Sequence, residues 1–508
     1  MAEVQVFSGF RRERIGVVAG LPMGTLLGVL VLALPGILSF SQQRYLAGGV
    51  WLLIWVLMTC LIAVPIRGRS AMTWLWQWLL WLVGHALGWS QWMSRASEGD
   101  VDNREVNDLD LPGALQYVET VDGPPLPSIG LRQPCLLHDK RDGGSWRMVA
   151  RVEHTGISMS SGERLNGQAQ GLGDMMASLA TSGIVRRLSI YARTEPGDDV
   201  ERQAWLVGHL DSRVPEEMRH SALSLEAQVR ATSISSDLFV CIEVGEGRIR
   251  REARAAGGGV LGRARVLYRH LGEVHQGLVG AGCTSVMWLT TPELVEAIRT
   301  GFEPSVRDEL ARARLAARAD EGVDAGVASI AAGPARAAGD RTIYRHGNFV
   351  TRSFTVMPPK NGTRVGSLAP LLTPGGNGER RTLAIHYEPM APEKAQRRAE
   401  REVNDTTLVS ETRSRMGLRV RRRERRQAEL VDRQEAVVAT GHTLVRHQVV
   451  CSVTVPVTMD IADHAAAMTA SARTRQLQPY PLDLAQDVGF VASVLPVGIG
   501  MPRRKDLF

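Results

Sequence analysis

The chain has 508 residues, of which 44% are hydrophobic and 22% are charged, and its formal net charge is +7. This average is typical of a soluble chain of about three domains, but eight of the eleven tryptophans lie in the first 92 residues. The 51 glycines and 24 prolines follow no period, which excludes a collagen-like or mostly disordered chain. We therefore expect an N-terminal fifth suited to a membrane, followed by a long polar region.

Two uncharged stretches, Ile15–Phe40 and Tyr45–Ile66, are separated only by a short polar turn. As a helix, the first would extend about 39 Å, which exceeds a hydrocarbon core of about 30 Å. The pattern predicts a transmembrane helical hairpin. Arginines are more numerous outside the hairpin than in its turn, so we expect a multi-pass protein of the cell membrane with both termini and the large domain in the cytoplasm.

A third uncharged stretch, residues 71–93, carries tryptophans at steps of three and four residues, which place them on one stripe of a helix. Tryptophan prefers the headgroup boundary, so this stripe predicts a helix that contacts lipid at the membrane interface. A third membrane span is the alternative that the sequence leaves open. The candidate interface residues are Trp74, Trp78, Trp81, Trp89 and Trp92.

After the membrane region, short β-rich runs alternate with helical segments in two successive blocks. This order predicts an α+β fold, in which the N-terminal transmembrane helical hairpin is followed by cytoplasmic antiparallel sheets with helices packed on one face. A long charged helix is expected over residues 392–439. The predicted divisions are a membrane hairpin with its Trp-rich helix (1–96), an acidic linker (97–112), a first α+β region (113–310), an Ala/Gly/Arg-rich connection (311–342) and a second α+β region (343–508).

Motifs for catalysis or cofactor binding are missing from the sequence. None of the four lysines follows a glycine, so there is no phosphate-binding P-loop. The glycines of residues 257–262 match GxGxxG in spacing but follow a charged run, which favours a loop or a helix start over a nucleotide site. The five cysteines form no CxxC pair. We expect them to be unpaired thiols that behave as small buried hydrophobic side chains in a reducing compartment. We expect no enzyme activity, no cofactor and no metal.

The densest basic feature lies within the predicted long helix, where glutamates are interspersed among arginines. A solvated helix with internal ion pairs is one interpretation, and contact with an acidic partner surface or a membrane is another. The lack of interleaved aromatic residues argues against direct contact with nucleic acid. The candidate partner-binding residues are Arg419, Arg421, Arg422, Arg423, Arg425 and Arg426.

Four stretches carry a family resemblance: WLTTPELVEAIRTGF (288–302), AAGP (331–334), TLAIHYEP (382–389) and LAQDVGFVASVLP (484–496). With the order of segments, they make the chain resemble actinobacterial membrane proteins associated with conjugation (type IV secretion) gene clusters. In that family the hairpin resembles a PrgI-type membrane subunit, and the remainder resembles the N-terminal, non-hydrolysing domain of the VirB-type ATPase. Because this chain stops at Phe508, the resemblance implies a split system in which another chain supplies the motor.

The expected function is therefore a membrane-anchored structural subunit of a type IV secretion machine, which docks a separate motor ATPase at the cytoplasmic face. Its expected partners are membrane lipid, other channel subunits and that motor, in an oligomeric assembly. The alternative is a two-span accessory subunit of a type VII secretion system. The translocated substrate, the stoichiometry and the interface residues do not follow from the sequence.

Overall fold

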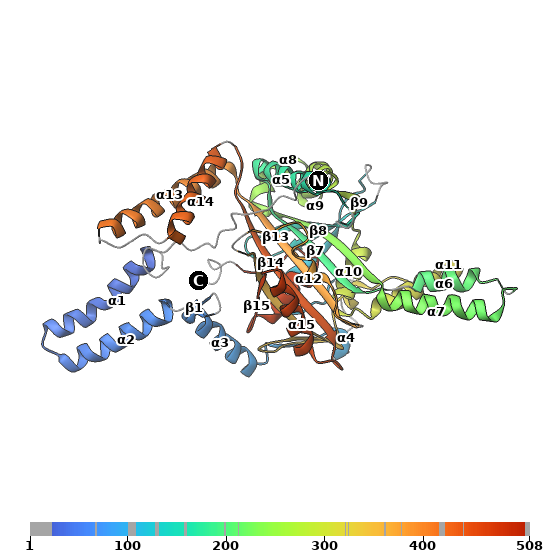
Figure 1. The fold of residues 1–508 in the computed structure, drawn as a ribbon, viewed down its shortest axis with the longest axis horizontal. Helices are drawn as coiled ribbons and strands as arrows, with labels where there is room; N and C mark the ends of the chain where they lie inside the picture. Colours follow the sequence, from blue (N-terminus) through green and yellow to red (C-terminus); the bar gives the residue numbers. More distant parts are fainter. Residues whose placement is uncertain are drawn as a thin grey trace. The chain divides into compact units, whose positions relative to one another are not determined.

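The computed structural model describes residues 23–502, except for positions 64, 67–68, 100–107, 127–131, 157–159, 198–199, 212, 321, 324, 360–361, 377, 416–421 and 440. The chain divides into two compact units (Figure 1). The larger unit includes Ser90–Ala391 and Val445–Phe508, and it holds the main sheet. The smaller unit is formed by Gly9–Trp89 and Pro392–Leu444.

The main sheet has thirteen strands in the described part of the chain, in the order β3-β10-β11-β12-β14-β13-β7-β8-β6-β5-β4, while β15 also pairs with β12 and β9 with β6. All of its paired strands are antiparallel. The strands are β3 (Gln91–Met93), β4 (Val118–Asp122), β5 (Cys135–Asp139), β6 (Ser145–His154), β7 (Val185–Pro196), β8 (Ile234–Gly245), β9 (Cys283–Trp288), β10 (Arg336–Gly339), β11 (Tyr344–His346), β12 (Phe349–Met357), β13 (Arg380–Pro389), β14 (Val445–Pro456) and β15 (Gln478–Pro481).

Helices of the larger unit lie between these strands along the chain, and the α+β class expected from the sequence is confirmed. They are α4 (Arg95–Glu98), α5 (Gly162–Ser182), α6 (Val200–His209), α7 (Glu216–Thr232), α8 (Glu246–Ala255), α9 (Gly259–Gly280), α10 (Thr291–Phe302), α11 (Val306–Ala319), α12 (Ala369–Leu372), α15 (Ile461–Thr474) and α16 (Gln486–Val494), with 3-10 turns at Gly113–Tyr117 and Ser329–Ala331.

The two halves of the larger unit repeat one topology. In the first half β6 pairs with β5, β8 and β9, and β8 pairs with β7. In the second half β12 pairs with β11, β14 and β15, and β14 pairs with β13. The halves join where β7 pairs with β13. Strands of the predicted regions 113–310 and 343–508 therefore share one continuous sheet.

Helices cover both faces of this sheet, so the prediction of helices on one face is wrong. On one side α10 and α16 pack against Tyr191, Phe239 and Ala384. On the other side α5, α8 and α9 cover the first half, and α12 and α15 pack against Leu383 and the second half. The physical reason is that central strands are buried on both faces, as in β8, where six consecutive residues from Phe239 are buried.

The C-terminal end of α10 is fixed to the sheet by buried donors. Arg193 Nη1 donates to the carbonyl of Ala297 at 2.8 Å, and His346 Nδ1 lies 2.6 Å from the carbonyl of Phe302. Arg380 Nη1 donates to the carbonyl of Thr300 at 2.5 Å. Since the last carbonyls of a helix lack partners within the helix, these side chains satisfy them and hold α10 in place.

The smaller unit contains the helices α1 (Met23–Ser41), α2 (Tyr45–Ala63) and α3 (Ala71–Ala86), and the short pair β1 (Pro65–Ile66) and β2 (Arg69–Ser70). None of the helices in the described part of the chain is both long enough and apolar enough to cross a membrane. The predicted N-terminal transmembrane hairpin is therefore wrong, and so is the predicted multi-pass localisation in the cell membrane. Helices α1 and α2 have 19 residues each in the described part of the chain.

The smaller unit also contains two helices in place of the single long helix expected over residues 392–439. They are α13 (Pro392–Arg415) and α14 (Arg422–Ala439), which pack against each other. Both lie between β13 and β14 in the chain, and α6 and α7 occupy the equivalent place between β7 and β8. The repeat thus includes a helical pair inserted at the same point of each half.

Candidate docking surfaces

The five candidate interface tryptophans do not all lie on one helix. Trp74, Trp78 and Trp81 lie on α3, which ends at Ala86. Trp89 follows that helix with 74% of its surface exposed. Trp92 lies on β3 and packs against the core of the larger unit. The predicted stripe therefore has three members on one helix, and its contact with lipid stays a prediction.

Four of the six candidate arginines, Arg422, Arg423, Arg425 and Arg426, lie at the start of α14. Arg419 and Arg421 lie outside the described residues. The backbone of the other four belongs to α14, and their side chains are not described. Their predicted role in partner binding therefore stays a prediction.

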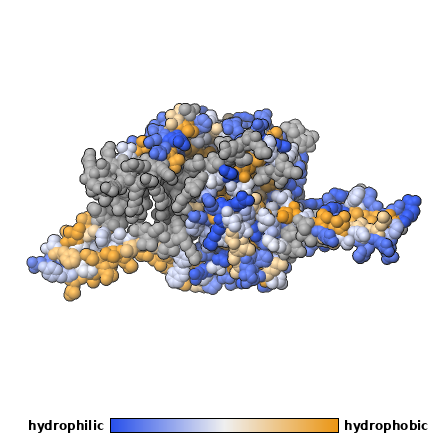
Figure 2. Space-filling view, in the orientation of Figure 1, coloured by the Kyte–Doolittle hydropathy of each residue, from blue (hydrophilic) through white to orange (hydrophobic). Residues whose placement is uncertain are grey.

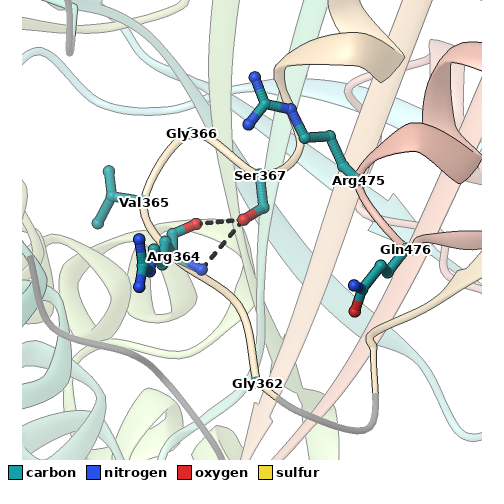
Figure 3. A pocket seen from close by; sticks show the side chains of 7 residues that line it. All are labelled: Gly362, Arg364, Val365, Gly366, Ser367, Arg475 and Gln476. Atoms are coloured by element: carbon teal, nitrogen blue, oxygen red, sulfur yellow. Dashed lines mark hydrogen bonds between the residues drawn. The ribbon is translucent and has the colours of Figure 1, made fainter.

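A shallow pocket of about 610 Å³ lies between the loop at residues 362–367 and the end of α15 (Figure 3). Arg364 and Arg475 both line it, but their guanidinium groups do not converge on one point (Figure 3). Ser367 Oγ is engaged with the backbone of Arg364. Arg475 follows the C-terminus of α15, where a cation complements the negative end of the helix dipole. The pocket is thus explained by local structure and carries no ligand assignment.

A second hollow, of about 570 Å³, lies beside Trp146, whose indole stacks on His138 with ring centroids 4.3 Å apart. Trp146 Nε1 donates to Glu246 at 2.7 Å, and Arg263 pairs with the same carboxylate at 2.5 Å. The pKa of Glu246 is lowered mainly by its hydrogen bonds from Arg263. The pKa of His138 is lowered mainly by burial. Since these charges satisfy one another, the hollow has no unpaired group that would select a ligand.

The most distinctive surface is a helical projection formed by α6, α7 and α11, which extends away from the sheet within the larger unit (Figure 1). We call these three helices the arm. Apolar residues gather along it (Figure 2). None of the described side chains of α6 or α7 is buried. Helices α6 and α7 therefore leave more apolar surface exposed than helices that pack an apolar face on a core.

Polar pairs connect the helices of the arm. Arg318 of α11 pairs with Glu201 of α6 at 2.9 Å, and Arg202 of α6 pairs with Glu226 of α7 at 2.9 Å. At its base Arg307 of α11 donates to Ser235 at 2.8 Å. The ion pairs are made on the sides of these helices that face one another, whereas large apolar side chains such as Trp205 and Leu225 stay exposed.

Six large apolar side chains of α6 and α7 are more than a third exposed, and Trp205 (61%), Met218 (64%) and Leu225 (61%) are the most exposed of them. The sequence analysis singled out none of these residues. Two signals could have identified them. Trp205 is a lone tryptophan in a charged stretch, and Met218, Ala222, Leu225 and Val229 follow the 4-3-4 spacing of a helix–helix seam. The six side chains are Trp205, Val207, Met218, Leu223, Leu225 and Val229, and Ile234 at the start of β8 is also exposed.

No group of three or more His, Cys, Asp or Glu in the described residues is arranged to hold a metal ion. Among the cysteines, burial raises the pKa of Cys135, Cys241 and Cys451 to about 12, so these thiols stay protonated.

No protein-family model matches the chain, and no curated protein matches it. The family resemblance drawn from the sequence therefore stays a prediction.

Proposed function

We propose that this protein is a non-enzymatic docking and assembly subunit of a type IV, conjugation-class secretion machine, and that it holds a separate motor ATPase in place. The arm carries the proposal. It projects beyond a sheet whose two faces are covered by helices, and its helix α6 exposes the apolar side chains of Trp205 and Val207. Contiguous exposed apolar surface is typical of protein contact sites.

The polar groups of the two hollows support a structural role in preference to catalysis. Glu246 is held by Trp146 and Arg263, and Arg475 sits at a helix end. The resemblance of the stretches at 288–302 and 484–496 supplies the class of machine and the identity of the motor as a VirB-type ATPase. Other channel subunits complete the proposed assembly, and no cofactor is part of it.

Co-purification tests this function. The full chain, with an affinity tag, is co-expressed with a VirB-type ATPase, and the captured ATPase is quantified. The proposal predicts capture by the native chain and a loss of at least tenfold for Trp205→Glu, which places a charge on the exposed face of α6. The matched control, Arg475→Ala at the shallow pocket, retains full capture. Absence of ATPase from a folded native chain, or recovery of type VII components in its place, contradicts the proposal.

A further inference from the structure

Helix α7 exposes a narrow apolar seam on one side of the arm. Met218, Leu225 and Val229 are 64%, 61% and 39% exposed, and Ala222 lies half-buried between them. Their spacing of four, three and four residues places all four side chains within one narrow stripe of the helix. This is the spacing with which one helix packs against another.

The seam is complementary to itself when two copies run antiparallel. A two-fold axis near its centre places Met218 opposite Val229 and the small Ala222 opposite the large Leu225. A parallel arrangement instead opposes Leu225 with Leu225 and Ala222 with Ala222, which crowds one layer and leaves a void in the next. Self-complementary matching of this kind is the requirement for a closed two-fold interface.

Charges beside the seam favour the same arrangement. Arg219 and Glu226 flank it on the side of α6, where Glu226 pairs with Arg202 at 2.9 Å. The antiparallel axis brings Arg219 of one copy toward Glu226 of the other, so opposite charges meet across the interface. Opposite charges beside the apolar seam set the orientation of paired helices.

We propose that α7 is a homodimerisation surface, and that two copies of this chain pair their arms with α7 antiparallel to α7. The inference names the occupant of the α7 side of the arm, and it stands whether or not α6 contacts a motor ATPase.

Light scattering on the purified full chain measures the mass as a function of concentration. The native chain is expected to reach twice the 55.5 kDa of one chain. Leu225→Glu is expected to weaken the dimer at least tenfold. Leu223→Glu is the matched control, since Leu223 is also exposed, at 42%, on the same helix but lies off the seam. Circular dichroism on both variants confirms that the fold is intact.

Disulfide trapping measures the orientation of the pair. Single variants Ala222→Cys and Leu225→Cys, each with the exposed Cys60 replaced by Ser, are mixed and oxidised. The antiparallel pair predicts a disulfide between the two variants, and a parallel pair predicts Ala222→Cys cross-linked to itself. A monomeric native chain, equal effects of Leu225→Glu and Leu223→Glu, or the parallel cross-link overturns the proposal. Because ATPase capture is measured separately, failure of the dimer is distinguishable from failure of the docking function.

Discussion

Phe302 of α10 and Phe490 of α16 lie with ring centroids 5.1 Å apart. Helix α10 follows β9 and α16 follows β15, and these strands are equivalent in the two halves. The two phenylalanines therefore connect equivalent helices of the repeat. Tyr344 and His346 complete the aromatic cluster, with ring centroids 5.0 and 4.5 Å from that of Phe490. The cluster joins both halves of the sheet on one face.

Replacing Phe490 by Ala is therefore expected to lower the free energy of unfolding by about 3–5 kcal/mol, because a fully buried ring is lost and its neighbours cannot refill the space. Chemical denaturation of the full chain measures the change. Trp205→Ala is the matched aromatic control, and at 61% exposure it should change stability by less than about 0.5 kcal/mol. Equal losses in both variants would show that the cluster is not a core element.

Acid is expected to destabilise the fold through two buried histidines. Burial lowers the pKa of His346 to about 3 and that of His386 to about 4. Their folded pKa values lie below the unfolded value of about 6.5, so the unfolded state binds protons first as the pH falls. The stability from each neutral ring is fully present above about pH 6.5 and falls by about 2 kcal/mol at pH 5.

Thermal denaturation between pH 7.5 and 5 measures this dependence. His386 accepts from Ser189 and donates to the carbonyl of Ala492, both at 2.8 Å, so His386→Gln retains a donor and an acceptor without a titrating group. We expect this variant to lose part of the slope of stability against pH. An unchanged slope in His386→Gln would contradict the assignment.

Glu379 is completely buried beside α15 and holds three groups together. Its carboxylate accepts from Arg381 at 2.5 Å and from the backbone of Gly375 at 2.9 Å, and lies 2.8 Å from His464 Nδ1. Glu379→Gln leaves the buried Arg381 without its counter-charge, so we expect a loss of about 3–5 kcal/mol in the free energy of unfolding. Glu119→Gln, which removes an exposed pair with Lys140, should cost less than about 1 kcal/mol. Urea denaturation measures both changes. Similar losses in the free energy of unfolding for the two variants would contradict the prediction that the buried carboxylate contributes more than the exposed one.

Gln476 occupies a left-handed position, φ +61°, directly after the end of α15. Its neighbour Leu477 donates back to the carbonyl of Ala472 at 3.1 Å, the pattern of a helix terminated by glycine. Gln476→Gly is expected to stabilise the fold by about 0.5–1 kcal/mol, because glycine adopts this φ without strain.

The reverse change after α5 is the matched control. Gly183 has φ +65°, and a Cβ there would meet nothing within 4 Å. Gly183→Ala therefore tests backbone strain alone and is expected to destabilise by about 1 kcal/mol. Changes of the same sign in the two variants, in paired thermal melts, would contradict this account of helix termination.

Local features of the larger unit could be predicted from the sequence. The order Thr291, Pro292, Glu293 is typical of a helix start, and α10 begins there, with the carboxylate of Glu293 accepting from the backbone of Thr290 at 2.9 Å. The run at residues 185–192 is a strand, as its β-branched and apolar pattern indicated. Such features depend on neighbouring residues, so a single sequence reveals them.

Long-range features could not be predicted in this way. The pairing of β7 with β13 connects Tyr191 to Ala384, and nothing in the local pattern indicates which distant strands meet. The apolar stretches near the N-terminus predicted spanning helices from hydropathy, whereas none of the described helices is both long enough and apolar enough to cross a membrane. The arm was missed because Trp205 and Leu225 are exposed, and hydropathy patterns alone do not distinguish a core-facing stripe from a partner-facing one.

The proposed function requires that the full chain binds a motor ATPase. The most direct test is to mix the purified full chain with a purified VirB-type ATPase and to measure the mass of the eluting species by size-exclusion chromatography with light scattering. A stable complex that contains both chains, and that is lost with Trp205→Glu, is the predicted result. Separate elution of the folded native chain and the ATPase at micromolar concentrations would contradict the claim.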